Sequence, residues 1–170
     1  MQSRRHNDYR FIMSYQEHLT KYIVLKPLKS KSTEEIAYNL IDICTLFGAP
    51  AILQSCSGKK FVTSVINKLH VIWDEVSIDY GWPKLSESQE TVERNNRDVQ
   101  EMLSAWMSKK NSSDWPSALK FIQFKKNRTF HSGIGTSPYE AMFRCTARVG
   151  IASSNLPNAE ITKIKTEEDL

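Results

Sequence analysis

The sequence predicts an α/β domain in which a mixed β-sheet is flanked by helices. Three observations predict it: an early hairpin pattern, a strongly amphipathic helix after it, and short apolar runs that then alternate with further helices. The chain has 170 residues, 40% of them hydrophobic, which is enough for one domain with its own core. We predict a single domain from residue 1 to residue 150 and, because periodicity is then lost, a loosely ordered tail over 151–170.

The hairpin is predicted from two segments rich in aromatic and β-branched residues. Tyr9–Tyr15 and Lys21–Leu28 both favour strands, and the polar Gln16–His18 between them is typical of a connection. Pro27 cannot donate to a ladder and is expected to weaken the end of the second strand.

The first helix has both of its ends marked in the sequence. Ser32 and Glu35 fit a capping box, in which each side chain bonds the other residue's backbone N–H. Gly48 is a typical C-cap, and Pro50 prevents continuation. Between the ends, apolar residues recur at helical spacing: Ile36, Ala37, Leu40, Ile41, Cys44 and Phe47.

The remaining elements follow from shorter patterns. Ala51–Gln54 is an apolar run typical of a buried parallel strand, and Glu75–Tyr80 alternates as a strand does. Helices are predicted over Phe61–Leu69, over Gln89–Lys109, over Trp115–Arg128 with Asp114 as its cap, and after Ser137, which forms a capping box with Glu140.

Composition excludes several classes of protein. No run approaches the roughly 20 apolar residues of a membrane helix, and no secretory signal opens the chain. Cys44, Cys56 and Cys145 have neither disulfide-framework nor zinc-ligand spacing, so we expect reduced thiols inside a cell. The net charge of +4 permits contact with nucleic acid without requiring it.

Three segments, in order, resemble the ribonuclease-H-like catalytic core of retroviral and Ty3/gypsy-type integrases. They are YQEHLTKYIVLKPLKSKSTEEIAYNLIDICTLFGAPAILQSCSGKKFV, SQETVERNN and HSGIGTSPYEAMF. The similarity covers residues 9–143 and is closest to host-domesticated, integrase-derived KRAB-A-domain and SCAN-domain proteins. It implies an ancestry in DNA integration, in which Asp, Asp and Glu hold two Mg²⁺ or Mn²⁺ ions for phosphoryl transfer.

The resemblance also implies that two of these three carboxylates are missing. Glu93 occupies the position of the glutamate, but Cys56 and Ser57 stand where the family has Asp–Asn before Gly58. A thiolate is a soft ligand that suits zinc better than magnesium. The first aspartate belongs to the family's central first strand, and Met1–Ser3 align with the loop after it. We therefore expect a core without its first strand, a vestigial Glu93, no bound metal and no cofactor.

The function implied is an integrase-derived interaction module that is catalytically inactive and binds nucleic acid. Lys59, Lys60, Arg94 and Arg97 are the candidate phosphate contacts. Whether the domain is an enzyme stays open, and the loss of two of the three carboxylates weighs against activity. The alternatives are a residual metal-dependent polynucleotidyl transferase or nuclease, and a decayed reading frame that folds poorly. The family implies DNA, a homodimer or a host protein as partners, a nuclear location and no membrane.

The aromatic residues of the last long helices have two interpretations. Their helical spacing is more typical of a core than of a base-stacking surface, although family helices of this kind also form a dimer interface. The residues are Trp106, Trp115, Phe121 and Phe124.

Overall fold

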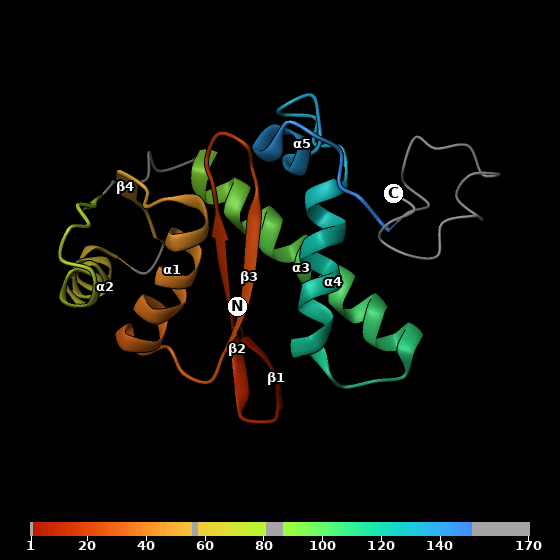
Figure 1. Cartoon of the computed structure of the whole chain (residues 1–170). Helices are drawn as coiled ribbons and strands as arrows, with labels where there is room; N and C mark the ends of the chain where they lie inside the picture. Colours follow the sequence, from red (N-terminus) through yellow and green to blue (C-terminus); the bar gives the residue numbers. More distant parts are fainter. Residues whose placement is uncertain (1, 56–57, 81–86, 151–170) are drawn as a thin grey trace, which may run out of the picture.

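The computed structural model describes residues 2–55, 58–80 and 87–150, so the predicted tail over 151–170 lies outside the described residues (Figure 1). In chain order the elements are β1 (Gln2–His6), β2 (Tyr9–Gln16), β3 (Ile23–Leu28), α1 (Thr33–Phe47), β4 (Ile52–Leu53), α2 (Lys59–Ile72), β5 (Asp79–Tyr80), α3 (Glu87–Lys110), α4 (Trp115–Arg128) and α5 (Pro138–Phe143). From β2 onward the predicted order of strands and helices is confirmed, whereas β1 was not predicted.

Strands β1, β2 and β3 form an antiparallel sheet in that spatial order. The predicted hairpin is β2–β3, in which Phe11 pairs with Leu28 and Gln16 pairs with Ile23. The prediction that Met1–Ser3 lie in a loop is wrong for its described part, because β1 begins at Gln2 and pairs with β2. Short polar strands of this kind carry no apolar alternation, so their pairing partner and not their own pattern determines the structure.

Strand β3 ends at Leu28, as predicted, with Pro27 inside it. Pro27 stays in the ladder opposite Ile12. The backbone N–H groups of Ile23 and Leu25 point away from β2, toward α4. Because amides alternate along a strand, the missing N–H of Pro27 falls on that same outer edge and removes no bond to β2.

The described strands form two sheets that are not joined. The second sheet pairs β4 with β5 in parallel, Ile52 with Asp79 and Leu53 with Tyr80. This interruption agrees with the expected loss of a joining strand from the integrase-type sheet. One expectation is wrong here: Ile52 is 57% exposed, so the AILQ run is not a buried strand. Strand β4 belongs to a sheet of only two strands. The run therefore lacks the second covering layer that buries a parallel strand in a larger sheet.

The helices lie on both sides of the hairpin (Figure 1). Helices α1 and α2 pack together on one side, and their cluster contains Ala37, Leu40, Val65 and Leu69. Helices α3 and α4 pack on the other side around Val99, Leu103, Trp115, Ala118, Leu119 and Ile122, together with Ile12, Ile23 and Leu25 from the hairpin. The hairpin therefore contributes apolar side chains to a core on each of its faces.

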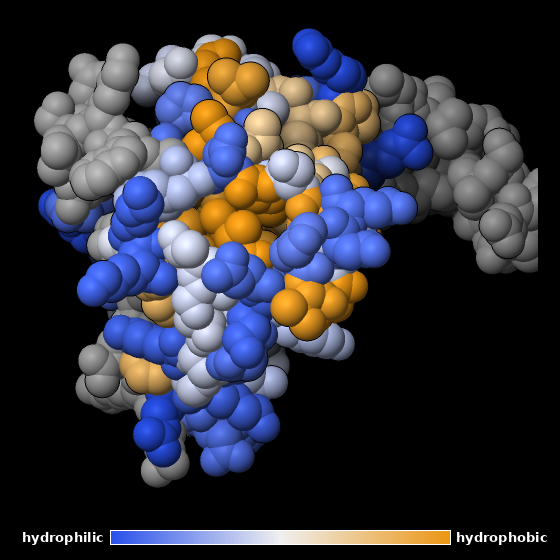
Figure 2. Space-filling view, turned by 90° about the vertical axis from the view of Figure 1, so that its left-hand side faces the viewer, coloured by the Kyte–Doolittle hydropathy of each residue, from blue (hydrophilic) through white to orange (hydrophobic). Residues whose placement is uncertain are grey.

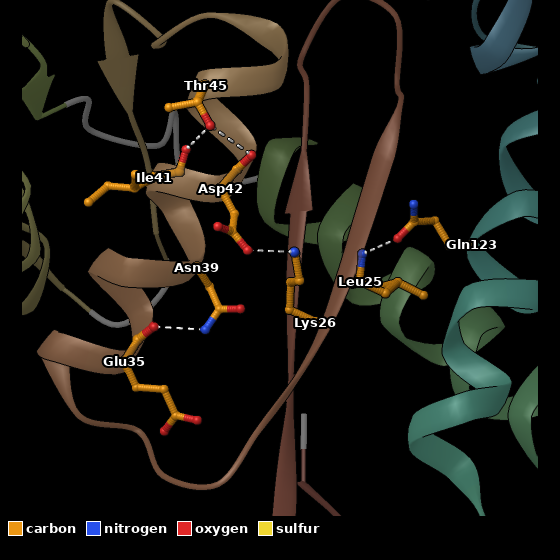
Figure 3. Close-up of polar contacts among 8 residues, drawn as sticks. All are labelled: Leu25, Lys26, Glu35, Asn39, Ile41, Asp42, Thr45 and Gln123. Atoms are coloured by element: carbon orange, nitrogen blue, oxygen red, sulfur yellow. Dashed lines mark hydrogen bonds and ion pairs between the residues drawn. The ribbon is translucent and has the colours of Figure 1, made fainter.

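Helix α4 hydrogen-bonds to the outer edge of β3 through two side chains. The Ile23 N–H donates to Asn127 Oδ1 at 2.9 Å, and Asn127 Nδ2 donates to the Ile23 carbonyl at 2.8 Å. One turn earlier on α4, Gln123 Oε1 accepts from the Leu25 N–H at 2.8 Å (Figure 3). Asn127 is 1% exposed, so its amide replaces a neighbouring strand in a dry environment.

On the other side, Lys26 of β3 forms an ion pair of 3.1 Å with Asp42 of α1 (Figure 3). The start of α1 differs from the predicted capping box. Ser32 Oγ accepts from the Glu35 N–H, but the Glu35 carboxylate accepts from the N–H groups of Lys29 and Ser30 instead of Ser32. The Ser32 N–H donates to Ser30 Oγ, which leaves the carboxylate available to the preceding turn.

We expect acidification to weaken this junction. Burial raises the pKa of Glu35, but the hydrogen bonds from Ser30 and Lys29 outweigh it and hold the pKa below the ordinary value of 4.5. A lowered folded-state pKa gives stability that is present above 4.5 and lost as the pH falls through the folded value. Urea unfolding from about pH 6 to about pH 3 should therefore show a smaller acid loss for Glu35→Gln than for the native chain. Glu75→Gln, at an exposed position, is the control; equal acid losses in Glu35→Gln and native protein would contradict this account.

Candidate nucleic-acid interface

Glu93, the expected vestige of the catalytic site, lies in the N-terminal part of α3 and is exposed to solvent. Asp8 cannot replace the first family aspartate, because it lies exposed in the turn between β1 and β2 with φ of 68°. In the described part of the chain, no three His, Cys, Asp or Glu side chains come together in a way that could hold a metal ion.

Cys56 and Ser57 lie outside the described residues, between β4 and α2. The residue after them, Gly58, is the N-cap of α2 and has φ of 87°, a conformation that side-chain-bearing residues rarely adopt.

The four predicted phosphate contacts are all on helices and all exposed. Lys59 and Lys60 are the first two residues of α2, whose N-terminus has no side-chain cap, and Arg94 and Arg97 belong to α3. Lys59, Lys60 and Arg97 form no ion pair with a carboxylate of the described residues. Uncapped N–H groups and lysines at one helix end both favour an anion.

Figure 2 shows the face on the side of α1, α2 and β4, where hydrophilic residues surround separate hydrophobic patches. The exposed large hydrophobic residues of these elements include Leu46 at 76%, Ile52 at 57% and Val71 at 82%. They are carried by three different elements. Scattered apolar residues of this kind are ordinary for a protein surface.

The aromatic residues of α3 and α4 separate into core and surface. Trp115 is 1% exposed and belongs to the core, as its spacing predicted. Phe121 is 62% exposed and Phe124 is 37% exposed, so the core interpretation is wrong for these two. Phe121, Phe124 and Arg128 follow each other at three and four residues and therefore share one face of α4. That spacing was readable in the sequence, but the side of α4 that packs on β3 was not.

Two hollows share Lys125 and Thr129 in their linings. One has a volume of about 350 Å³ and is lined by Lys125, Arg128, Thr129, Ser137, Glu140, Thr146 and Ala147. The other, of about 330 Å³, lies between α3 and α4 and is lined by Asp98, Glu101, Met102, Lys125, Lys126 and Thr129. Glu140 is already engaged by the N-terminus of α5, where Ser137 and Thr136 donate to it. The hydrogen bond from Ser137, followed by that from Thr136, lowers the pKa of Glu140.

Solved structures with a similar fold include retroviral integrase cores. The catalytic core of HTLV-2 integrase, in a trimeric form with magnesium, superposes with a TM-score of 0.63 over 81% of this chain and 88% of its own, at 13% identity. The BIV integrase core gives 0.63 over the same shares at 20% identity.

This is the fold of a retroviral integrase catalytic core.

The integrase-core fold confirms the resemblance found in the sequence, and at these identities it shows the fold alone. A simian T-cell lymphotropic virus intasome, solved in complex with the PP2A regulatory subunit B56 gamma, also matches, with a TM-score of 0.60 over 83% of this chain and 50% of that chain at 14% identity. The HTLV-2 core is also known in a dimeric form.

Similar sequences connect this integrase-core fold with host proteins. Human KRAB-A domain-containing protein 2 is 39% identical over all 170 residues, which are 35% of its length. A transposon-derived protein of Caenorhabditis elegans is 27% identical over 122 residues, 71% of this chain and 42% of that protein. The chain thus spans less than half of either relative. No family model matches it, and no described helix is long and apolar enough to cross a bilayer.

Proposed function

We propose that this integrase-core domain binds duplex DNA through Lys59, Lys60, Arg94 and Arg97 and performs no strand transfer. The observation that carries the proposal is the exposure of all four cations on an integrase-core fold. Exposed Lys and Arg side chains gain affinity for a duplex by releasing its condensed counterions, which requires no base contact. The proposal places the domain in the nucleus, where such DNA is available.

The loss of catalysis is supported by the residues themselves. Two Mg²⁺ ions need several hard oxygen ligands, and Cys56 stands where the resemblance places one of the family's carboxylates. Glu93 alone supplies one carboxylate. Homo-oligomers and a complex with a host protein are recorded for structures of the same fold, so we propose a second copy or a host protein as additional partners.

The test uses a labelled duplex of about 20 base pairs and fluorescence anisotropy. The variant Lys59→Gln/Lys60→Gln/Arg94→Gln/Arg97→Gln is expected to bind at least about 10-fold more weakly, with a shallower dependence on salt, because phosphate contacts are lost. Lys29→Gln/Lys31→Gln removes two other exposed lysines and is expected to change affinity little. Equal weakening by both variants would contradict a specific surface.

The enzymatic alternative is tested in the same samples. Incubation of the duplex with Mg²⁺ or Mn²⁺ is expected to give no cleavage or joining products, and neither metal should shift the thermal melt of native or Glu93→Gln protein. A metal-dependent stabilisation that Glu93→Gln abolishes would instead support a residual transferase or nuclease. A decayed reading frame would show no cooperative melt at all.

A further inference from the structure

The two sheets border one apolar cluster without being joined across it. The cluster between α1 and α2 is also contacted by Met13 and Tyr15 of β2 and by Leu53 of β4, and all three of these side chains are only partly buried. In the part of the chain that the structure describes, no strand pairs β2 with β4. The cluster is therefore incompletely covered where the hairpin sheet ends and the β4–β5 sheet begins.

Strand β1 accompanies β2 over only part of its length. Gln2 pairs with Phe11, and β2 continues to Gln16. Ser14 lies opposite Leu25, whose N–H points away from β2 toward α4. In such a pair of an antiparallel ladder both residues direct their N–H and carbonyl groups outward, so those of Ser14 point to the β1 side. No described strand pairs with β2 there. We refer to this side of β1 and β2 as the β1 edge; such an edge accepts another strand.

A buried acceptor without a partner lies on α3, behind the same edge. Asn96 Oδ1 is inaccessible to solvent and accepts no hydrogen bond from the described residues. Asn96 precedes Val99 by three residues and shares its face of α3. Val99 is fully buried in the cluster that contains Ile12 of β2. Asn96 therefore lies one turn from this contact, toward the start of α3 on the α1 and β4 side of the hairpin (Figure 1). Buried acceptors are normally paired, so its position indicates a missing donor.

Together these features specify the chemistry of an occupant. It has to offer backbone groups to Ser14, apolar side chains to the cluster of α1 and α2, and a donor to Asn96 on its opposite face. A β-strand has this combination, because its side chains alternate between two faces. A nucleic acid has no such backbone ladder. A second copy of the chain could offer only its own β1 edge, and the polar QSRRH sequence of β1 cannot cover an apolar cluster.

We propose that the β1 edge binds an extended segment of another protein, which pairs with β2 at Ser14 and lies between β2 and β4. Its side chains alternate between apolar residues, which cover Met13, Tyr15 and Leu53, and polar residues, one of which donates to Asn96. Main-chain hydrogen bonds give such strand addition its affinity, and the alternating side chains give it selectivity. The proposal rests on the proposed partnership with a host protein and names the kind of segment bound; it uses none of the four cations proposed to contact DNA.

Hydrogen exchange tests whether the edge is open in the protein alone. The Ser14 N–H is expected to exchange at least about 100-fold faster than the Val24 N–H, which points into the β2–β3 ladder opposite Tyr15. Amide exchange read by nuclear magnetic resonance measures both groups in one sample. Equal protection of the two groups would mean that the edge is already occupied, and it would overturn the proposal.

The binding probe is a labelled peptide of about ten residues, in which valine and threonine alternate between terminal lysines. Its control has the same composition with the valines grouped together, which removes the apolar face. In fluorescence anisotropy the alternating peptide is expected to bind the protein at least about 10-fold more tightly than the control. Bound peptide should also slow the exchange of the Ser14 N–H by at least about 10-fold. Equal binding of the two peptides, or binding that leaves Ser14 exchange unchanged, overturns the proposal.

Two variants locate the bound peptide. Ser14→Pro removes an N–H from an open edge, as Pro27 does on the outer edge of β3, and is expected to weaken peptide binding about 10-fold. Asn96→Leu removes the unpaired acceptor, so it should raise the thermal midpoint of the free protein while weakening peptide binding about 5-fold. Asn67→Leu, at an exposed asparagine of α2, is the matched control and should change neither quantity.

If Ser14→Pro fails to fold, Asn96→Leu decides the outcome. Peptide affinity that is unchanged in Asn96→Leu overturns the proposal. Duplex anisotropy on the same samples separates this inference from the DNA contacts. Duplex binding without peptide binding defeats the strand proposal alone, and peptide binding without duplex binding defeats the DNA contacts alone.

Discussion

Replacing Asn127 by leucine is expected to lower the free energy of unfolding by about 3 kcal/mol. The change removes both hydrogen bonds to Ile23 and leaves its N–H and carbonyl facing a side chain that cannot pair with them. Each buried backbone group without a partner costs about 1–3 kcal/mol, and Asn127 is 1% exposed, so water cannot replace it. Urea unfolding followed by circular dichroism measures the difference.

Two further variants make this measurement specific. Gln123→Leu breaks the one bond to Leu25 and is expected to cost about half as much. Asn67→Leu changes an exposed asparagine on α2 and should stay within about 0.5 kcal/mol of the native chain. If Asn127→Leu also stayed within that range, the bonds between α4 and β3 would have no part in stability.

Trp115→Ala is expected to be the most damaging single change, at about 3–5 kcal/mol. The side chain is 1% exposed at the start of α4, and its ring meets Tyr9 edge-on with centroids 6.4 Å apart. Truncation therefore opens a cavity between the hairpin and both long helices. Thermal and urea unfolding measure the effect, and Trp115→Phe, which keeps most of the volume, should cost about 1–2 kcal/mol.

If Trp115→Ala leaves too little folded protein to measure, Trp115→Phe provides the decisive value. A tryptophan-to-phenylalanine change that left unfolding unaltered would show that the ring is not part of a close-packed core. For comparison, Phe121→Ala removes an exposed ring from the same helix and is expected to have a small effect on stability.

The sequence predicted those elements whose ends or apolar stripes are locally encoded. Helix α4 begins and ends where predicted, because Asp114 caps it by accepting from the Ser117 N–H and its last turn is basic. Helix α5 has the full capping box of Ser137 and Glu140. These features need only neighbouring residues, so a single sequence contains them.

What the sequence did not reveal depends on partners distant in the chain. Strand β1 is polar and exists through its pairing with β2, and β5 is much shorter than the alternating Glu75–Tyr80 segment suggested. The Asn127 contact joins residues 104 positions apart, and nothing local distinguishes a buried asparagine from an exposed one. The duplex contacts came from a resemblance, whereas the aromatic face of α4 required knowing which side of the helix packs on β3.

The hydrogen bonds between Asn127 and Ile23 also determine at which edge the β1–β2–β3 sheet can gain another strand. A strand can join a sheet only where backbone N–H and carbonyl groups are available. At β3, α4 has taken those groups, so that edge rejects another chain. In the described part of the protein, β1 pairs on one side only. Any polypeptide that lengthens this sheet, whether a neighbouring segment of a longer protein or a separate molecule, has to be received at β1.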